Sequence, residues 1–212
     1  MSILDQLDWT RVREHYDERV DVHRHLLRLH GDGKMQALAE LLLGVTNGVA
    51  NYSAAEHALG PRILSENADA VRRIYELADR FQQLTAARTV PKLVRDAQLS
   101  YLGIGVGSEA SCMMNPETCW VANTRTIWTH LVIKHADDMD KASEELKLYR
   151  SADPSSKMAY AMWTEIHRLL ETSMTRISKE GSVSSRSAGV APGDKRYLWA
   201  DAIANQLYAE HR

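Results

Sequence analysis

The chain has 212 residues, which is long enough to bury a sizeable core without metal or disulfide cross-links. A content of 44% hydrophobic and 25% charged residues is that of a globular protein and argues against extended disorder. The formal net charge of −2 argues against a strongly basic nucleic-acid-binding surface over the whole protein, although it leaves room for a local basic patch.

The amino-terminal segment carries charges too early and too often for a signal peptide. No later segment approaches the roughly 20 apolar residues that a membrane-spanning helix needs. We therefore predict a soluble, cytoplasmic protein without a membrane partner. Two cysteines, Cys112 and Cys119, are too few for a disulfide framework or a four-cysteine zinc site, so we interpret them as partly buried free thiols.

Hydrophobic periodicity predicts an all-α fold. Apolar residues recur mostly at intervals of three and four, few prolines or glycines interrupt them, and no alternating β-branched run is bounded by hairpin turns. In chain order, the predicted helices cover about residues 5–30, 35–58 with a break near 46–53, 65–88, 91–113, 116–135 continuing or restarting to 150, 154–179, and 195–211. We expect about six or seven helices in a single compact domain.

Helix starts and the one low-complexity segment set the expected boundaries. Asn115-Pro116 and Asp153-Pro154 each place a capping acceptor before a proline, which is typical of a first helical position. Residues 181–194 are rich in Ser and Gly and lack a packing stripe, so we predict a long surface loop there. The expected organisation is a helical domain at 1–180, this loop, and a C-terminal helix at 195–212 that packs on the same domain, with Asp194 as its cap.

Three glycines at alternate positions in GIGVG, residues 103–107, raise the question of a phosphate-binding loop. Such a loop needs a strand before it and a helix after it, whereas the sequence predicts helix on both sides. Gly103, Gly107 and Ser111 are four apart and would form a shallow stripe on a helix, where another backbone can pack closely. An interior helix glycine costs about 0.5–1 kcal/mol relative to alanine, so these glycines need a compensating reason. Close helix packing would supply it, and a ligand-binding floor or a helix break is the alternative.

The segment Arg125-Thr-Ile-Trp-Thr-His130 resembles the Arg-x4-His motif of the HEPN ribonuclease superfamily, whose members are compact helical domains that usually dimerise. The resemblance covers these six residues and the all-helical setting, and Thr126 stands where members often carry Asn, Asp or His. It implies a metal-independent ribonuclease acting on RNA, in which Arg125 binds the phosphate and His130 acts as acid or base. A near-neutral reference pKa suits His130 to that role.

The geometry of this pair separates two functions. Residues five apart on a regular helix point about 140° apart, so Arg125 and His130 share a face only if Arg125 lies in a first or distorted turn. That requires the helix to begin near Asn123 or Thr124 rather than at Pro116, and the pair would then lie at a positive helix end. If the two side chains diverge into packing instead, the alternative is a non-enzymatic helical interaction or oligomerisation protein.

The predicted first helix carries polar residues where a core is expected. Its 3.5-residue seam consists of Trp9, Val12, Tyr16, Arg19, His23, Leu26 and His30. A buried Arg or His must be paired or hydrogen-bonded, so this seam borders a polar cleft, packs at a subunit interface, or holds side chains that extend to the edge of the core. We take Arg19, His23, Asn123 and Glu109 as candidate substrate- or ligand-binding residues.

A carboxylate-bridged metal centre is a less favoured alternative. The Glu-x-x-His spacing that such centres use is absent, and the reversed spacings of His15 with Glu18 and of His135 with Asp138 also fit solvated helix faces. We predict no metal ligand and no cofactor. The small-residue stripe and the polar seam together predict a homo-oligomer, a dimer in the first instance, with RNA or another protein as further candidate partners.

Overall fold

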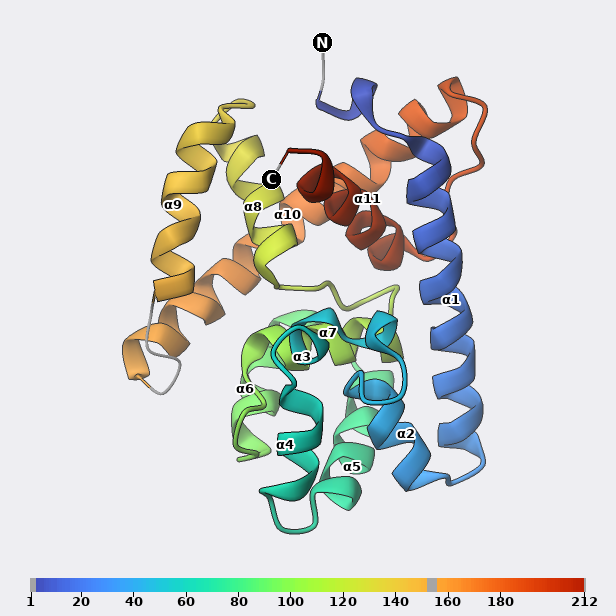
Figure 1. Ribbon diagram of the computed structural model, residues 1–212, viewed down its shortest axis with the longest axis vertical. Helices are drawn as coiled ribbons and strands as arrows, with labels where there is room; N and C mark the ends of the chain where they lie inside the picture. Colours follow the sequence, from blue (N-terminus) through green and yellow to red (C-terminus); the bar gives the residue numbers. More distant parts are fainter. Residues whose placement is uncertain (1–2, 152–155, 212) are drawn as a thin grey trace. The chain divides into compact units, whose positions relative to one another are not determined.

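The computed structural model describes residues 3–151 and 156–211. These residues form helices and no strand, with eleven α-helices and three 3-10 helices (Figure 1). The helices are η1 (Ile3–Gln6), α1 (Trp9–Gly31), α2 (Met35–Leu42), η2 (Gly48–Ala50), α3 (Tyr52–Ala55), α4 (Leu59–Ser65), α5 (Ala70–Gln82), η3 (Ala87–Thr89), α6 (Val90–Asp96), α7 (Ile104–Met114), α8 (Thr124–Lys134), α9 (Met139–Ser151), α10 (Lys157–Ser187) and α11 (Arg196–His211). The all-α prediction is confirmed, whereas six or seven helices was too few because several predicted helices are divided.

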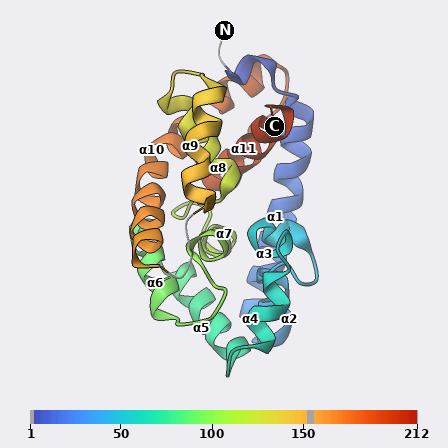
Figure 2. The same cartoon turned by 60° about the vertical axis from the view of Figure 1, so that its left-hand side comes forward.

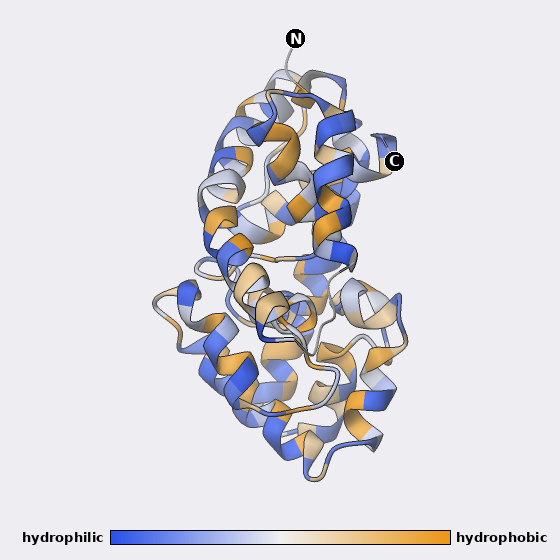
Figure 3. Cartoon of the chain, turned by 90° about the vertical axis from the view of Figure 1, so that its left-hand side faces the viewer, coloured by the Kyte–Doolittle hydropathy of each residue, from blue (hydrophilic) through white to orange (hydrophobic). Residues whose placement is uncertain are grey.

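The chain separates into two compact units, whereas we expected one domain. Unit 1 comprises Met1–Asp17 and Ala122–Arg212, and unit 2 comprises Glu18–Val121. The helices of both units carry hydrophilic and hydrophobic residues side by side, as Figure 3 shows, which is the pattern of amphipathic helices. Within the described residues, no helix has the length and apolar character needed to cross a membrane.

Unit 2 is built around α7. Every residue of this helix except Gly105 is buried, because it is apolar or small on almost all sides. Helices α3, α5 and α6 pack against it (Figure 2). The core of unit 2 is therefore a short central helix with other helices around it.

Unit 1 is built around α11. Eight consecutive residues, Tyr197–Ala204, are buried, and α11 packs against α8 and α10. Its interior is aromatic: the ring of Trp199 stacks on Trp9 with centroids 6.0 Å apart and meets the edge of Tyr16 at 5.5 Å. Such pairs add to the stability gained from burying the rings.

The predicted helix over residues 91–113 is divided into α6 and α7. Pro91 does lie in the first turn of α6, as expected. Gln98 and Tyr101 then adopt φ angles of +49° and +67°, which end helical geometry. Gly103 is consequently the N-cap of α7 and not a member of the same helix as Gly107 and Ser111, so the three residues do not form the predicted stripe.

The helix predicted to begin at Pro116 begins at Thr124 instead. Asn115 is used differently from our prediction: its side-chain Nδ2 donates to the backbone oxygens of Phe81, Gln82 and Leu84, at 3.3, 3.3 and 2.9 Å. These carbonyls lie at the end of α5, where helices leave acceptors unsatisfied. The other predicted start, Asp153-Pro154, lies outside the described residues.

The loop predicted at residues 181–194 is confirmed over residues 188–194 and wrong over 181–187, because α10 continues to Ser187. Gly181 and Ser185 are buried one helical turn apart, and a Cβ at Gly181 would lie 2.4 Å from Ile203 Cδ1 of α11. The small residues therefore permit close helix packing rather than forming a loop. At the start of α11, the Tyr16 hydroxyl donates to Asp194 Oδ1 at 2.5 Å and accepts from the Lys195 backbone at 2.9 Å.

Candidate functional site

Helix α8 has a well-defined start. The Asn123 side chain accepts from the backbone N–H groups of Arg125 and Thr126, at 3.0 and 3.1 Å, and Thr126 Oγ1 accepts from the Asn123 N–H at 3.0 Å. This reciprocal pair is a capping box, which fixes the first helical turn. Asn123 is thus a structural cap. Arg125 lies in the first turn, as expected if the helix begins near Asn123 or Thr124 rather than at Pro116.

Arg125 and His130 both lie within α8, which is helical without interruption from Thr124 to Lys134. A regular helix directs residues five apart about 140° from one another and about 7.5 Å apart along the axis. Both side chains are half-buried. Within one copy of the chain, α8 therefore directs the two predicted catalytic side chains to different faces.

The imidazole of His130 contacts α10. Its Nδ1 atom lies 2.7 Å from Oγ of Ser173, a buried residue. Burial lowers the pKa of His130 below its usual 6.5, and the positive charge of Lys134 lowers it further, while Glu145 opposes the shift. His130 is consequently neutral near pH 7 and joins α8 to α10 by a hydrogen bond.

A charged network links the same part of α8 to α9. Glu145 accepts from Lys134 Nζ at 2.7 and 2.8 Å and from His135 Nε2 at 2.8 Å. Burial acts to raise the pKa of Glu145, but the hydrogen bonds from Lys134 and His135 outweigh it and lower the pKa. Ser173 was not among the candidates predicted from the sequence. The four-residue spacing of His130 and Lys134 was the available sequence signal for this cluster, because it places both side chains on one helix face.

In unit 2, Arg19 and Glu109 form a fully buried ion pair. Arg19 Nη1 lies 3.1 Å from Glu109 Oε1, both side chains are 0% exposed, and the same Nη1 donates to the Val49 carbonyl at 2.7 Å. The two Glu109 oxygens accept from the backbone N–H groups of Tyr52 and Ser53, each at 3.0 Å. This carboxylate therefore pairs with α1 and caps the start of α3 at once.

The remaining polar interior of unit 2 also meets backbone groups. His23 Nδ1 lies 2.7 Å from the Met113 carbonyl oxygen, which can only accept, so Nδ1 carries the proton. Asn51 donates to the carbonyls of Leu42 and Val106 at 3.2 and 3.0 Å. Arg19, His23 and Glu109, three of our candidate ligand-binding residues, thus converge in the interior and hold α1, α3 and α7 together.

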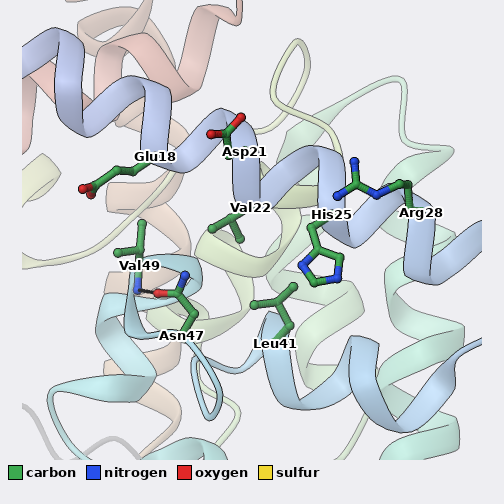
Figure 4. A pocket seen from close by; sticks show the side chains of 8 residues that line it. All are labelled: Glu18, Asp21, Val22, His25, Arg28, Leu41, Asn47 and Val49. Carbon is green, nitrogen blue, oxygen red and sulfur yellow. Dashed lines mark hydrogen bonds between the residues drawn. The ribbon is translucent and has the colours of Figure 1, made fainter.

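A surface hollow of about 490 Å³ lies in unit 2 between α1, α2 and the segment before η2 (Figure 4). It is lined by Glu18, Asp21, Val22, His25, Arg28, Leu41, Asn47 and Val49. In Figure 4 the Glu18 side chain points away from Asp21 and His25, and the imidazole of His25 points toward Leu41. Within the part of the chain that the structure describes, no group of three or more His, Cys, Asp or Glu side chains is placed to hold a metal ion.

A second hollow, of about 380 Å³, lies in unit 1 between η1, α8 and α10. Neither hollow is lined by Arg125 or His130. These two hollows, where a small ligand has room, are therefore separate from the predicted catalytic pair.

Gly107 and Gly103 have different surroundings. A Cβ at Gly107 would lie 2.2 Å from Val94 Cγ2, so α6 approaches α7 as closely as a glycine permits. At Gly103 no atom lies within 4 Å of such a Cβ. Ser111 is buried and donates to the Ser108 carbonyl at 2.7 Å. Close packing at this segment is thus concentrated at Gly107.

Comparison of the chain with family models, with curated proteins and with solved structures finds no match. The functional assignment accordingly rests on the residues and their geometry.

Proposed function

We propose that this protein is a non-catalytic helical interaction protein that associates with a second copy of itself. The observation that carries the proposal is the hydrogen bond of His130 to Ser173 on an uninterrupted α8, a helix whose regular geometry separates residues five apart by about 140°. A ribonuclease needs its phosphate-binding and proton-transfer groups at one phosphate. Side chains that point to different faces of one helix fit a packing role better. A cytoplasmic location is part of the proposal, as expected from the sequence.

The solvent-facing surface of α10 supports the self-associating part of the proposal. Seven large apolar side chains are exposed in the described residues, and three of them, Met158, Leu169 and Val183, are on α10 with exposed fractions of 82%, 38% and 60%. These three side chains share one face of the helix, where Met158 is the most exposed large apolar side chain of the described residues. A light-scattering series from about 1 to about 100 μM should show the molar mass rise above that of a monomer, and a constant monomer mass would refute self-association.

A HEPN-like ribonuclease is the second candidate, and one observation favours it. Because α8 begins at Thr124, Arg125 lies at the positive end of the helix, where a phosphate of RNA is attracted. In a dimer, the Arg125 of one copy would have to meet the His130 of the other. This arrangement would make RNA the substrate and leave the fold unchanged.

Incubation with a broad panel of RNAs, in the presence of a metal chelator, separates the two candidates. We expect no cleavage by the wild-type protein. Cleavage that disappears in both His130→Ala and Arg125→Ala, with circular dichroism showing intact helices, would overturn the non-catalytic proposal and establish the nuclease. Cleavage that survives in both variants would indicate a contaminating enzyme, and a repeat with repurified protein should then show none.

A further inference from the structure

Helix α10 exposes one continuous face over most of its 31 residues. Starting at Met158, a spacing of alternately four and three residues leads to Val183, and every position on the way is exposed except the half-buried Met162. This set, which we call the α10 seam, consists of Met158, Met162, Glu165, Leu169, Thr172, Arg176, Lys179 and Val183. Alternating spacings of three and four are those of the contact positions in coiled coils.

The buried residues of α10 lie on the other side of the helix. Ile166, Leu170, Met174 and Ile177 are at most 2% exposed and belong to the core of unit 1. The helix therefore has two distinct faces, one packed in the core of unit 1 and one largely exposed, on which Arg176 also borders the hollow beside η1. About 37 Å of helix separates the two ends of the seam, at 1.5 Å per residue.

The spacing of the seam is symmetric when it is read in reverse, and one pair of symmetric positions, Glu165 and Arg176, carries opposite charges. About a centre between residues 170 and 171, each seam position has a counterpart at the same distance on the other side. The four pairs are Met158 with Val183, Met162 with Lys179, Glu165 with Arg176, and Leu169 with Thr172. An antiparallel second copy would place each residue opposite its counterpart, because a two-fold axis brings residue i to j and residue j to i.

Charge distinguishes the antiparallel from the parallel arrangement. Antiparallel pairing puts Glu165 of each copy opposite Arg176 of the other, which gives two attractive pairs. Parallel pairing would put Glu165 opposite Glu165 and Arg176 opposite Arg176, and like charges facing each other disfavour association. We infer that two copies of this chain pair through their α10 helices, which run antiparallel and cross between residues 170 and 171. This inference rests on the proposed self-association.

Existing contacts of the charged seam residues permit this exchange. Glu165 accepts from Arg168 at 2.5 and 3.0 Å, and Arg176 donates to Glu180 at 2.8 Å. All four side chains are about half exposed. Exposed pairs within one helix contribute little to stability, so they oppose the new pairs weakly. Because the seam is narrower than a standard interface, the expected Kd lies in the micromolar range.

Charge reversal tests the pairing. Glu165→Arg alone and Arg176→Glu alone each create two like-charge pairs in a homodimer, and each should weaken the dimer at least about tenfold in sedimentation equilibrium. An equimolar mixture of the two variants should regain wild-type affinity. In the mixed dimer the introduced arginine of one variant faces the introduced glutamate of the other, and the native Arg176 faces the native Glu165. The double variant Glu165→Arg/Arg176→Glu should also regain wild-type affinity. Circular dichroism of each variant checks that the helices remain.

Disulfide trapping tests direction and register. Met158→Cys mixed with Val183→Cys should give a covalent heterodimer under mild oxidation, whereas each variant alone should give none, because its two cysteines would lie about 37 Å apart. The native Cys112 and Cys119 are buried, and oxidation of the wild-type protein measures the background cross-linking that they cause. Cross-linking of Met158→Cys with itself would indicate parallel pairing and overturn the inference.

The outcomes separate this inference from the proposed function. A wild-type protein that stays monomeric refutes both. A wild-type dimer whose affinity is unchanged by either charge reversal keeps the self-association and overturns the α10 pairing. Loss in the single variants with recovery in the mixture supports both.

Discussion

The two units enclose a buried helix in different ways. In unit 2, α7 carries the charged Glu109 into the interior, where Arg19 and two backbone N–H groups meet it. In unit 1, α11 stacks its own Trp199 on the ring of Trp9 and also buries Asp201, and its neighbour α10 leaves apolar residues on the surface. Three polar residues that stood out in the sequence, Arg19, His23 and Glu109, are thus buried in unit 2, whereas the surface that we propose for a partner belongs to unit 1.

The largest expected effect comes from breaking the ion pair of unit 2. Arg19→Met leaves the Glu109 carboxylate buried beside an apolar side chain, so the free energy of unfolding should fall by about 3–5 kcal/mol. Urea denaturation measures it. The matched control is Arg72→Met, which removes an exposed pair with Glu76 and should leave the free energy of unfolding nearly unchanged. Similar small losses in both variants would show that the buried pair does not organise unit 2.

Two glycine substitutions compare close helix packing in the two units. Gly107→Ala should lower the free energy of unfolding by about 1–3 kcal/mol, because Val94 is stiff at χ1 and also presents its Cβ at 3.2 Å. Gly181→Ala should cost less than Gly107→Ala, since the flexible end of Ile203 can move, Trp9 Cη2 lies farther away at 3.3 Å, and alanine favours a helix. Gly103→Ser, at an N-cap with open surroundings, should be neutral. Equal losses at Gly107 and Gly181 would contradict this difference.

Acid should destabilise the protein through a buried histidine of unit 1. Burial lowers the pKa of His167 from 6.5 to about 4, so between these values the unfolded chain binds a proton that the folded chain does not. Stability should therefore fall by about 2 kcal/mol from about pH 7.5 to about pH 5. In His167→Gln this part of the pH dependence should disappear from urea titrations. An unchanged pH dependence in that variant would assign the loss to other groups.

The smallest effect concerns the His130–Ser173 contact. His130→Ala and Ser173→Ala should each cost about 1 kcal/mol of unfolding free energy, and the double variant should cost less than the sum because both remove the same hydrogen bond. Thermal unfolding of the four proteins completes the cycle. Fully additive losses would show that the contact contributes nothing, and would leave His130 available for another role.

The helical class could be predicted because it depends on local periodicity, while the errors arose from distant partners. Pro116 has the local sequence of a helix start, but the Asn115 amide is used by carbonyls more than 30 residues earlier. Residues 181–187 have the composition of a loop, yet Gly181 and Ser185 permit α10 to pack closely. Local sequence does not show which distant element a small or polar residue meets.

The candidate site follows the same rule. The capped start at Asn123 was one of two possibilities readable from the sequence, because capping is local. The partner of His130 was not readable, since Ser173 lies 43 residues away on another helix. The buried pairing of Arg19 was expected in kind, because an interior Arg needs a partner, but its identity as Glu109 depends on how α1 and α7 pack.

One matched pair of surface variants tests the proposal that the partner-binding surface belongs to unit 1. Leu169 lies near the centre of the α10 seam at 38% exposure, and Met35 on α2 of unit 2 is exposed to a similar 43%. Sedimentation equilibrium at about 100 μM should show wild type and Met35→Lys above the monomer mass of 23.9 kDa, and Leu169→Lys at that mass. Dimers that persist in Leu169→Lys, or that are lost in Met35→Lys, would contradict the account.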